Sequence, residues 1–123
     1  MRGVMAKPLH TVAETPQFIR DAAGAGLTAD ERRVIVDVIA SNPTAGDEVR
    51  GSGGVRKVRI AGRGKGKSGG YRLMAAYFGT DAPVYLLALL SKGERANFSD
   101  QEIRGFKSLT AEISLFWRKR NKK

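Results

Sequence analysis

The chain has 123 residues with 22 Lys and Arg, 12 Asp and Glu, one His and no Cys, which gives a formal net charge of +10. This length suits one domain, 1–123, around one hydrophobic core. The absence of Cys excludes a disulfide framework, a thiolate metal site and a cysteine nucleophile. A content of 41% hydrophobic and 28% charged residues is typical of a folded protein rather than a disordered one.

The first third of the chain predicts a short strand and two helices. Residues 10–14 are β-prone, and Thr15, which precedes a proline, provides the N-cap of the first helix. Thr28 and Glu31 form the capping box of a second helix, which carries an apolar stripe. We expect the two helices to form an antiparallel hairpin. The residues of the stripe are Leu27, Val34, Ile35, Val38 and Ile39.

From residue 51 onward the hydrophobic pattern changes to a period of two, which is typical of strands. Residues 55–61 place Val58 and Ile60 on one face and Lys57 and Arg59 on the other. A strand here would bury the first pair of side chains and present the second pair to the solvent.

Two further strands and a helix complete the predicted elements. Residues 71–78 form one strand, and residues 84–90 form another that is apolar on both faces and therefore belongs inside the sheet. Ser99 and Glu102 form a capping box at the start of the last helix, which precedes a basic tail, 118–123. The apolar residues at helical spacing are Ile103, Phe106, Leu109, Ile113 and Phe116.

These elements predict an α+β fold. It consists of a small antiparallel sheet of about four strands, an N-terminal helical hairpin and a C-terminal helix. We expect the helices to cover one face of the sheet and the bases to occupy the other face.

The tail and the tryptophan before it allow several interpretations. The five bases of residues 118–123 either complement the C-terminal dipole of the last helix, belong to a disordered tail, or add nonspecific attraction to RNA. We predict that loss of the tail weakens binding without abolishing activity. Trp117 and Phe116 are expected to pack the helix onto the body, with a platform for a nucleobase as the alternative.

The positive charge is concentrated in one segment, since eight basic and no acidic residues lie between positions 49 and 80. Within it, residues 62–70 form a basic, glycine-rich loop between two predicted strands. The loop partly matches nucleotide-binding patterns, but no helix follows it, so these interpretations fail. A basic hairpin loop suits the backbone of a polyanion such as RNA, and a merely solvated charged loop is the alternative.

The order of several segments resembles the HigB-type branch of the RelE/ParE toxin superfamily over about residues 9–116. The segments are the basic stretch 51–59, the loop 64–70 with Arg72 behind it, the stretch 92–97 and the helix that follows Ser99. The resemblance implies a RelE-like fold and the toxin of a type II toxin–antitoxin pair. Such a toxin cuts messenger RNA in the ribosomal A site and uses no metal or other cofactor.

RNA cleavage by its own 2′-hydroxyl needs a base, cations around the phosphorus and an acid for the leaving 5′ oxygen. With one His and no acid in the basic segment, Arg, Lys and Tyr are left for these tasks. By position, Arg72 and Lys92 resemble the paired cations of the family. Lys65 and Lys67 resemble the bases of the family's basic loop. The catalytic candidates are thus Arg72, Lys92, Lys67 and Lys65.

Other bases of the same segment are assigned to RNA binding, namely Arg56, Lys57, Arg59 and Arg63. Some relatives use a tyrosine near the C-terminus, but this chain has no tyrosine beyond Tyr85. The group that transfers the proton therefore stays open among the lysines, with Tyr71 and Tyr77 as further alternatives. No metal ligands are expected.

The implied partners are messenger RNA on the ribosome and an antitoxin, expected to be a helix-turn-helix protein of the HigA kind. A ParE-like toxin that inhibits gyrase and a non-catalytic RNA- or ribosome-binding module are the alternative functions. The longest apolar run, residues 84–90, is far shorter than the roughly 20 residues of a membrane helix. Without an apolar signal segment in residues 1–25, we expect a cytoplasmic protein.

Overall fold

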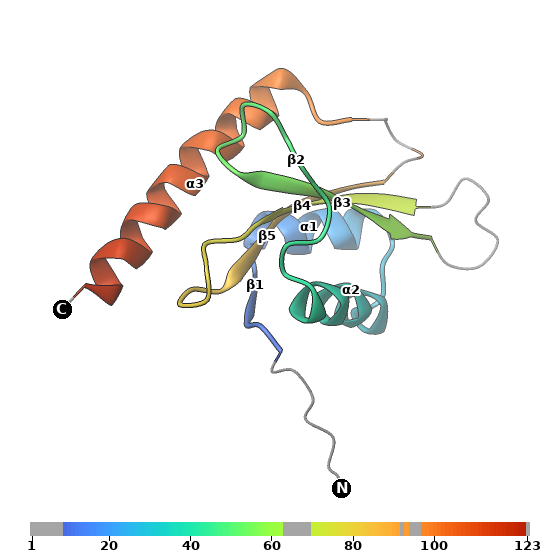
Figure 1. Cartoon of the computed structure of the whole chain (residues 1–123). Helices are drawn as coiled ribbons and strands as arrows, with labels where there is room; N and C mark the ends of the chain where they lie inside the picture. The colour runs from blue at the N-terminus through green and yellow to red at the C-terminus, as the bar shows by residue number, and fades with distance from the viewer. Residues whose placement is uncertain (1–8, 63–69, 92, 94–96, 123) are drawn as a thin grey trace, which may run out of the picture.

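A central sheet of five strands carries helices on both of its faces in the computed structural model (Figure 1). The structure describes residues 9–62, 70–91, 93 and 97–122. The elements in chain order are β1 (Val12–Glu14), α1 (Pro16–Gly24), α2 (Ala29–Ser41), β2 (Asp47–Glu48), β3 (Val55–Ala61), β4 (Gly70–Ala76), β5 (Val84–Ser91) and α3 (Asp100–Asn121). The predicted α+β class is therefore confirmed.

The sheet has the strand order β1-β5-β4-β3-β2. The strands β3, β4 and β5 pair antiparallel with their neighbours in sequence, as their short connections predict. Two features differ from the expected sheet of about four antiparallel strands. The strand β2 has only two residues, too few for a periodic pattern, and β1 pairs parallel to β5, which follows far along the chain.

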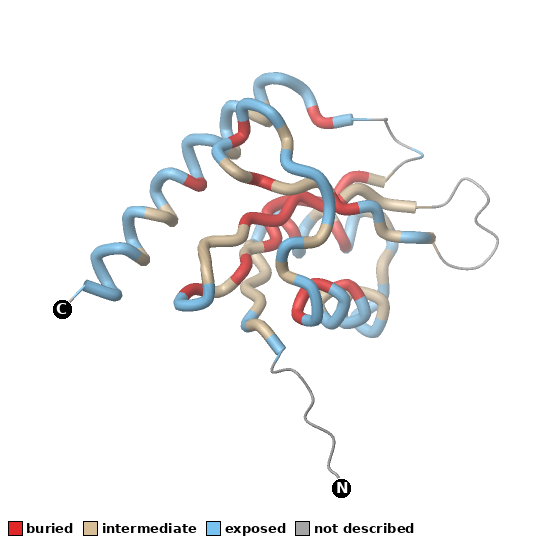
Figure 2. The backbone as a smooth tube through the Cα atoms, in the orientation of Figure 1, coloured by how far each residue is buried: buried red, intermediate tan, exposed pale blue. Residues whose placement is uncertain are grey.

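Two hydrophobic clusters lie on opposite faces of the sheet. One joins Phe18 of α1 and Ile39 of α2 to Leu73 and Leu86 of the sheet. The other packs α3 against the opposite face of β3, β4 and β5. The prediction that helices cover only one face is wrong, because β4 and β5 are apolar on both faces and need cover on both. Figure 2 shows this burial along the central strands, whereas α3 is exposed over much of its length.

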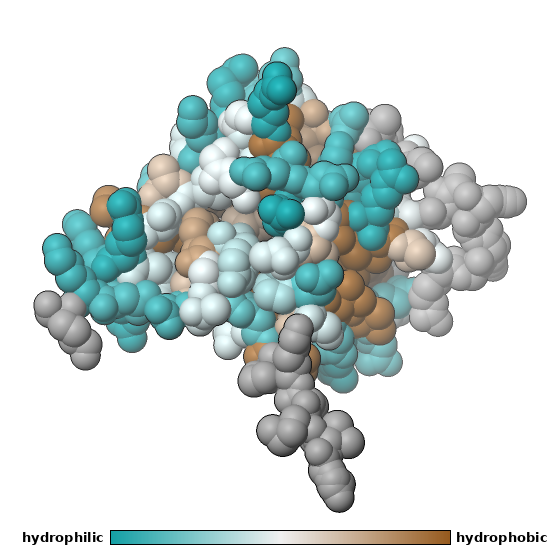
Figure 3. Space-filling model, viewed as in Figure 1, coloured by the Kyte–Doolittle hydropathy of each residue, from teal (hydrophilic) through white to brown (hydrophobic). Residues whose placement is uncertain are grey.

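The predicted apolar stripes are only partly buried. On α2, Ile35 and Ile39 are buried, but Val34 and Val38 are 58% and 45% exposed. Figure 3 shows hydrophobic residues gathered between β3 and α2, where Val34 and Ile60 line a hollow. On α3, Phe116 is 55% exposed, so it does not pack the helix onto the body as expected.

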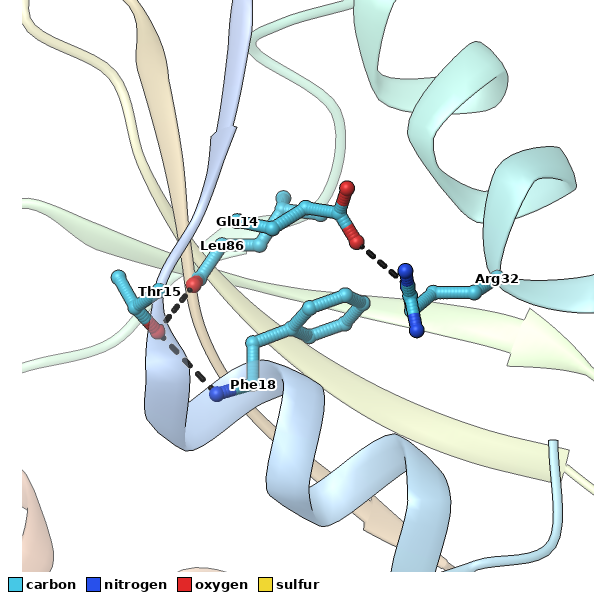
Figure 4. Close-up of polar contacts among 5 residues, drawn as sticks. All are labelled: Glu14, Thr15, Phe18, Arg32 and Leu86. Carbon is cyan, nitrogen blue, oxygen red and sulfur yellow. Dashed lines mark hydrogen bonds and ion pairs between the residues drawn. The ribbon is translucent and has the colours of Figure 1, made fainter. Parts of the chain in front are cut away.

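The three helices begin at the N-cap residues that the sequence predicts. The capping boxes at Thr28 and Ser99 are both formed. Thr15 links α1 to the sheet as well as capping it, because its hydroxyl accepts from Phe18 N at 3.1 Å and donates to Leu86 O at 2.8 Å (Figure 4). Among the described residues, no helix combines the length and the apolar character that crossing a membrane requires.

Substituting Thr15→Val should lower the free energy of unfolding by about 1–2 kcal/mol, since it removes a helix cap and a bond to the sheet together. Urea unfolding measures the change. The matched control is Thr28→Val, because the Thr28 hydroxyl accepts from Glu31 N within α2 and makes a local cap. A Thr15 variant that loses no more stability than the Thr28 variant would contradict the link between α1 and β5.

Candidate functional site

Three basic residues share one face of the sheet near the end at which β3 leads toward β4. In the register of the sheet, Arg59 lies opposite Arg72, and Arg72 lies opposite Leu90 of β5. Lys57 is two residues before Arg59 and therefore points to the same face. We call Lys57, Arg59 and Arg72 the basic face. It belongs to the side of the sheet that α3 covers, because Leu90 is part of the cluster under α3.

Arg72 is the member of the basic face with an unsatisfied donor. Arg72 as a whole is half-buried. Its Nε atom is fully buried and has no hydrogen-bond partner among the described residues. A buried donor without a partner costs free energy, and an anion supplied by a ligand would remove that cost. An arginine fork binds a phosphate through two parallel hydrogen bonds, so this position suits a phosphate group.

The short strand β2 brings two acids beside the basic segment. Asp47 lies opposite Lys57, and Glu48 lies opposite Arg56. Opposite charges on facing positions of neighbouring strands attract one another. Arg59 and Arg72 lie opposite each other past the end of β2, and we call this pair the arginine row. In the described sheet, no acidic residue is paired with either arginine. The positive charge is thus least compensated at the outer end of the hairpin.

The residues assigned to RNA binding do not all lie together. Arg56 belongs to the face of β3 opposite the basic face, and its Nε donates to Thr44 O at 2.8 Å. Arg59 is exposed on the basic face. The structure therefore groups Arg59 and Lys57 with Arg72 and separates Arg56 from them.

A long-range hydrogen bond holds Lys57. Its Nζ donates to Asn97 Oδ1 at 3.0 Å. Asn97 comes just before Ser99, the N-cap of α3, so the bond joins β3 to the start of the last helix. No local pattern signals this contact, because the two residues are 40 positions apart.

Four of the predicted residues, Arg63, Lys65, Lys67 and Lys92, lie outside the described residues. Their neighbours in the chain are described. Ala61 pairs with Gly70 across the hairpin, and Ser91 pairs with Tyr71. These four described neighbours lie at the end of the sheet that carries Arg72. The chain therefore enters and leaves these segments beside the basic face.

The other proton-transfer candidates lie elsewhere. Tyr71 packs with the cluster of α1 and α2, on the face of β4 opposite Arg72. The ring of Tyr77 lies 5.4 Å from that of His10, and Nε2 of His10 lies 2.9 Å from Ala82 O. Neither tyrosine is part of the basic face. Within the described ranges, no group of three or more His, Asp or Glu side chains could hold a metal ion.

A family model matches most of the chain. The family is described as the RelE toxin of the RelE / RelB toxin-antitoxin system, and the match covers residues 17–121. These residues run from α1 to the end of α3 and include the whole basic face.

Proposed function

Because the chain belongs to the RelE toxin family and is the toxin of a toxin–antitoxin pair, we propose that it cuts messenger RNA in the ribosomal A site and so inhibits translation. The observation that carries this proposal is the paired row of Arg59 and Arg72, with a buried Nε of Arg72 that lacks a partner among the described residues. This row offers two cations to one anion at an end of the sheet with little negative charge.

The reaction that suits these residues is attack by the RNA's own 2′-hydroxyl. The 2′ oxygen forms a bond to phosphorus, the bond from phosphorus to the 5′ oxygen breaks, and the products are a 2′,3′-cyclic phosphate and a 5′-hydroxyl. Negative charge gathers on the phosphoryl oxygens in the transition state, and the guanidinium groups of Arg72 and Arg59 stabilise it. No metal is required for this step.

Two protons move in the reaction. A base takes the proton of the 2′-hydroxyl, and an acid gives a proton to the leaving 5′ oxygen. We assign these roles to Lys65 and Lys67, which lie between Arg59 and Arg72 in the sequence, and to Lys92, which follows the last residue of β5 in the sequence. The tyrosines are less suited to them, because Tyr71 and Tyr77 are directed away from the basic face.

The antitoxin is the second partner, and its neutralising role follows from the family. We propose that it is a helix-turn-helix protein of the HigA kind, on the resemblance of residues 51–59 and 92–97 to the HigB branch. We also propose that the toxin acts in the cytoplasm, where ribosomes carry the proposed substrate.

Cleavage in a purified translation system tests the proposal. The protein should cut a message that is held on programmed ribosomes, should leave free message intact, and should be unaffected by EDTA. The new 3′ ends should carry a cyclic phosphate. Binding to ribosomes without cutting would overturn the proposal in favour of a non-catalytic module, and inhibition of gyrase supercoiling with intact message would favour a ParE-like toxin.

A further inference from the structure

A second feature with nucleic-acid chemistry lies at the C-terminal end of α3. A hollow of about 660 Å³ is lined by the aromatic residues Tyr77, Phe78 and Trp117 and by the basic residues Arg118 and Lys122. None of the described residues that line it is acidic. Bases of single-stranded nucleic acids stack on aromatic rings while cations contact their phosphates. The hollow combines both kinds of group.

Hydrogen bonds hold the tryptophan and the helix end in place. Trp117 Nε1 donates to Tyr85 OH at 2.8 Å, which orients the indole over β5. Asn121 Nδ2 donates to Asp81 O at 3.3 Å, which ties the end of α3 to the connection between β4 and β5. A surface that is already ordered loses little conformational entropy when it binds a ligand.

Three bases of the tail, Arg118, Lys119 and Arg120, are part of this ordered end. The helix α3 continues through Asn121, so residues 118–121 form its last turn and do not belong to a disordered tail. The Arg120 guanidinium lies 5.9 Å from the centroid of the Trp117 ring, as a cation over an aromatic face. In Figure 3 this end of α3 is largely covered by hydrophilic residues.

The hollow is separate from the basic face. Arg72 lies near the start of β4, whereas Tyr77 follows its last residue, Ala76. Five residues of extended chain span roughly 15 Å, so one ligand group cannot contact both places. We propose that the hollow at Trp117 is a second RNA site that binds a single-stranded segment by stacking and phosphate contacts, independently of cleavage.

Trp117 is the one tryptophan of the chain, so its fluorescence reports directly on this hollow. The probe is a single-stranded 2′-O-methyl octanucleotide, which has no free 2′-hydroxyl and cannot be cut by this chemistry. The full chain should show saturable quenching of Trp117, with an affinity that falls as salt rises. The double variant Arg118→Ala with Lys122→Ala should bind about tenfold more weakly.

The control variant removes equal charge from other exposed positions, Arg33→Ala with Arg104→Ala, and should bind within about twofold of the parent. Circular dichroism of each variant checks that the fold is retained. The proposal is overturned if the octanucleotide binds without changing Trp117 fluorescence, or if the Arg118/Lys122 variant and the control bind equally. Quenching by an acidic peptide but not by the octanucleotide would also overturn it and would identify a protein site.

Discussion

Replacing Arg72 with Ala should lower the rate of cleavage of ribosome-bound message by about a hundredfold or more and remove growth arrest in cells that express the toxin without its antitoxin. The cause is the loss of a preorganised cation next to the phosphoryl oxygens, an effect of about 10²–10³ in rate for one donor. Adding Lys92→Ala should abolish the remaining activity. Cleavage in the purified system and growth after induction measure both effects.

Two controls separate this role of Arg72 from a structural one. Arg72→Lys keeps the charge but loses the fork, so it should recover only part of the rate. Arg20→Ala removes an exposed arginine of α1 that contacts Gln17, and should stay as toxic as the parent. Equal toxicity of the parent and of the variant with both Arg72→Ala and Lys92→Ala would sink the assignment of the site.

Replacing Phe18 with Ala should lower the free energy of unfolding by about 3–5 kcal/mol, the largest stability effect that we expect from a single substitution. Phe18 is 0% exposed and lies in the cluster that joins α1 and α2 to β4 and β5. Removing its ring leaves a cavity in close-packed surroundings. Because small domains are stable by only about 5–15 kcal/mol, the variant should approach the unfolding threshold.

Urea unfolding followed by circular dichroism measures the loss for Phe18→Ala. The adjacent Ile19 provides the control, because it is 38% exposed on the same helix, and Ile19→Ala should cost less than about 2 kcal/mol. If the two variants lose similar amounts, α1 does not pack against the sheet through Phe18.

Local signals in the sequence predicted the helices and most of the sheet. Thr28 with Glu31 and Ser99 with Glu102 cap helices through contacts three residues apart, so they can be recognised without the fold. The bounds of β3, residues 55–61, follow from alternation and agree with the structure. The parallel pair β1–β5 depends on residues about 70 positions apart and leaves no local pattern.

In the candidate site, too, the sequence predicts local contacts but not contacts between residues far apart in the chain. The hairpin of β3 and β4 is local, and its antiparallel pairing places Arg59 beside Arg72. Alternation along β3 alone places the two RNA-binding candidates Arg56 and Arg59 on opposite faces of the sheet. The acid opposite Lys57, Asp47, belongs to a strand too short to recognise. Asn97 reaches Lys57 only through the tertiary fold.

Mapping the 5′ ends of messenger RNA fragments at single-nucleotide resolution, after induction of the parent and of the Arg72→Ala variant, tests the proposed function most directly. A toxin that cuts in the ribosomal A site should produce ends only within translated regions and in one fixed phase of the reading frame. These ends should be absent for Arg72→Ala. Ends without a codon phase, ends of equal frequency in untranslated RNA, or the same ends in the variant would contradict the proposal.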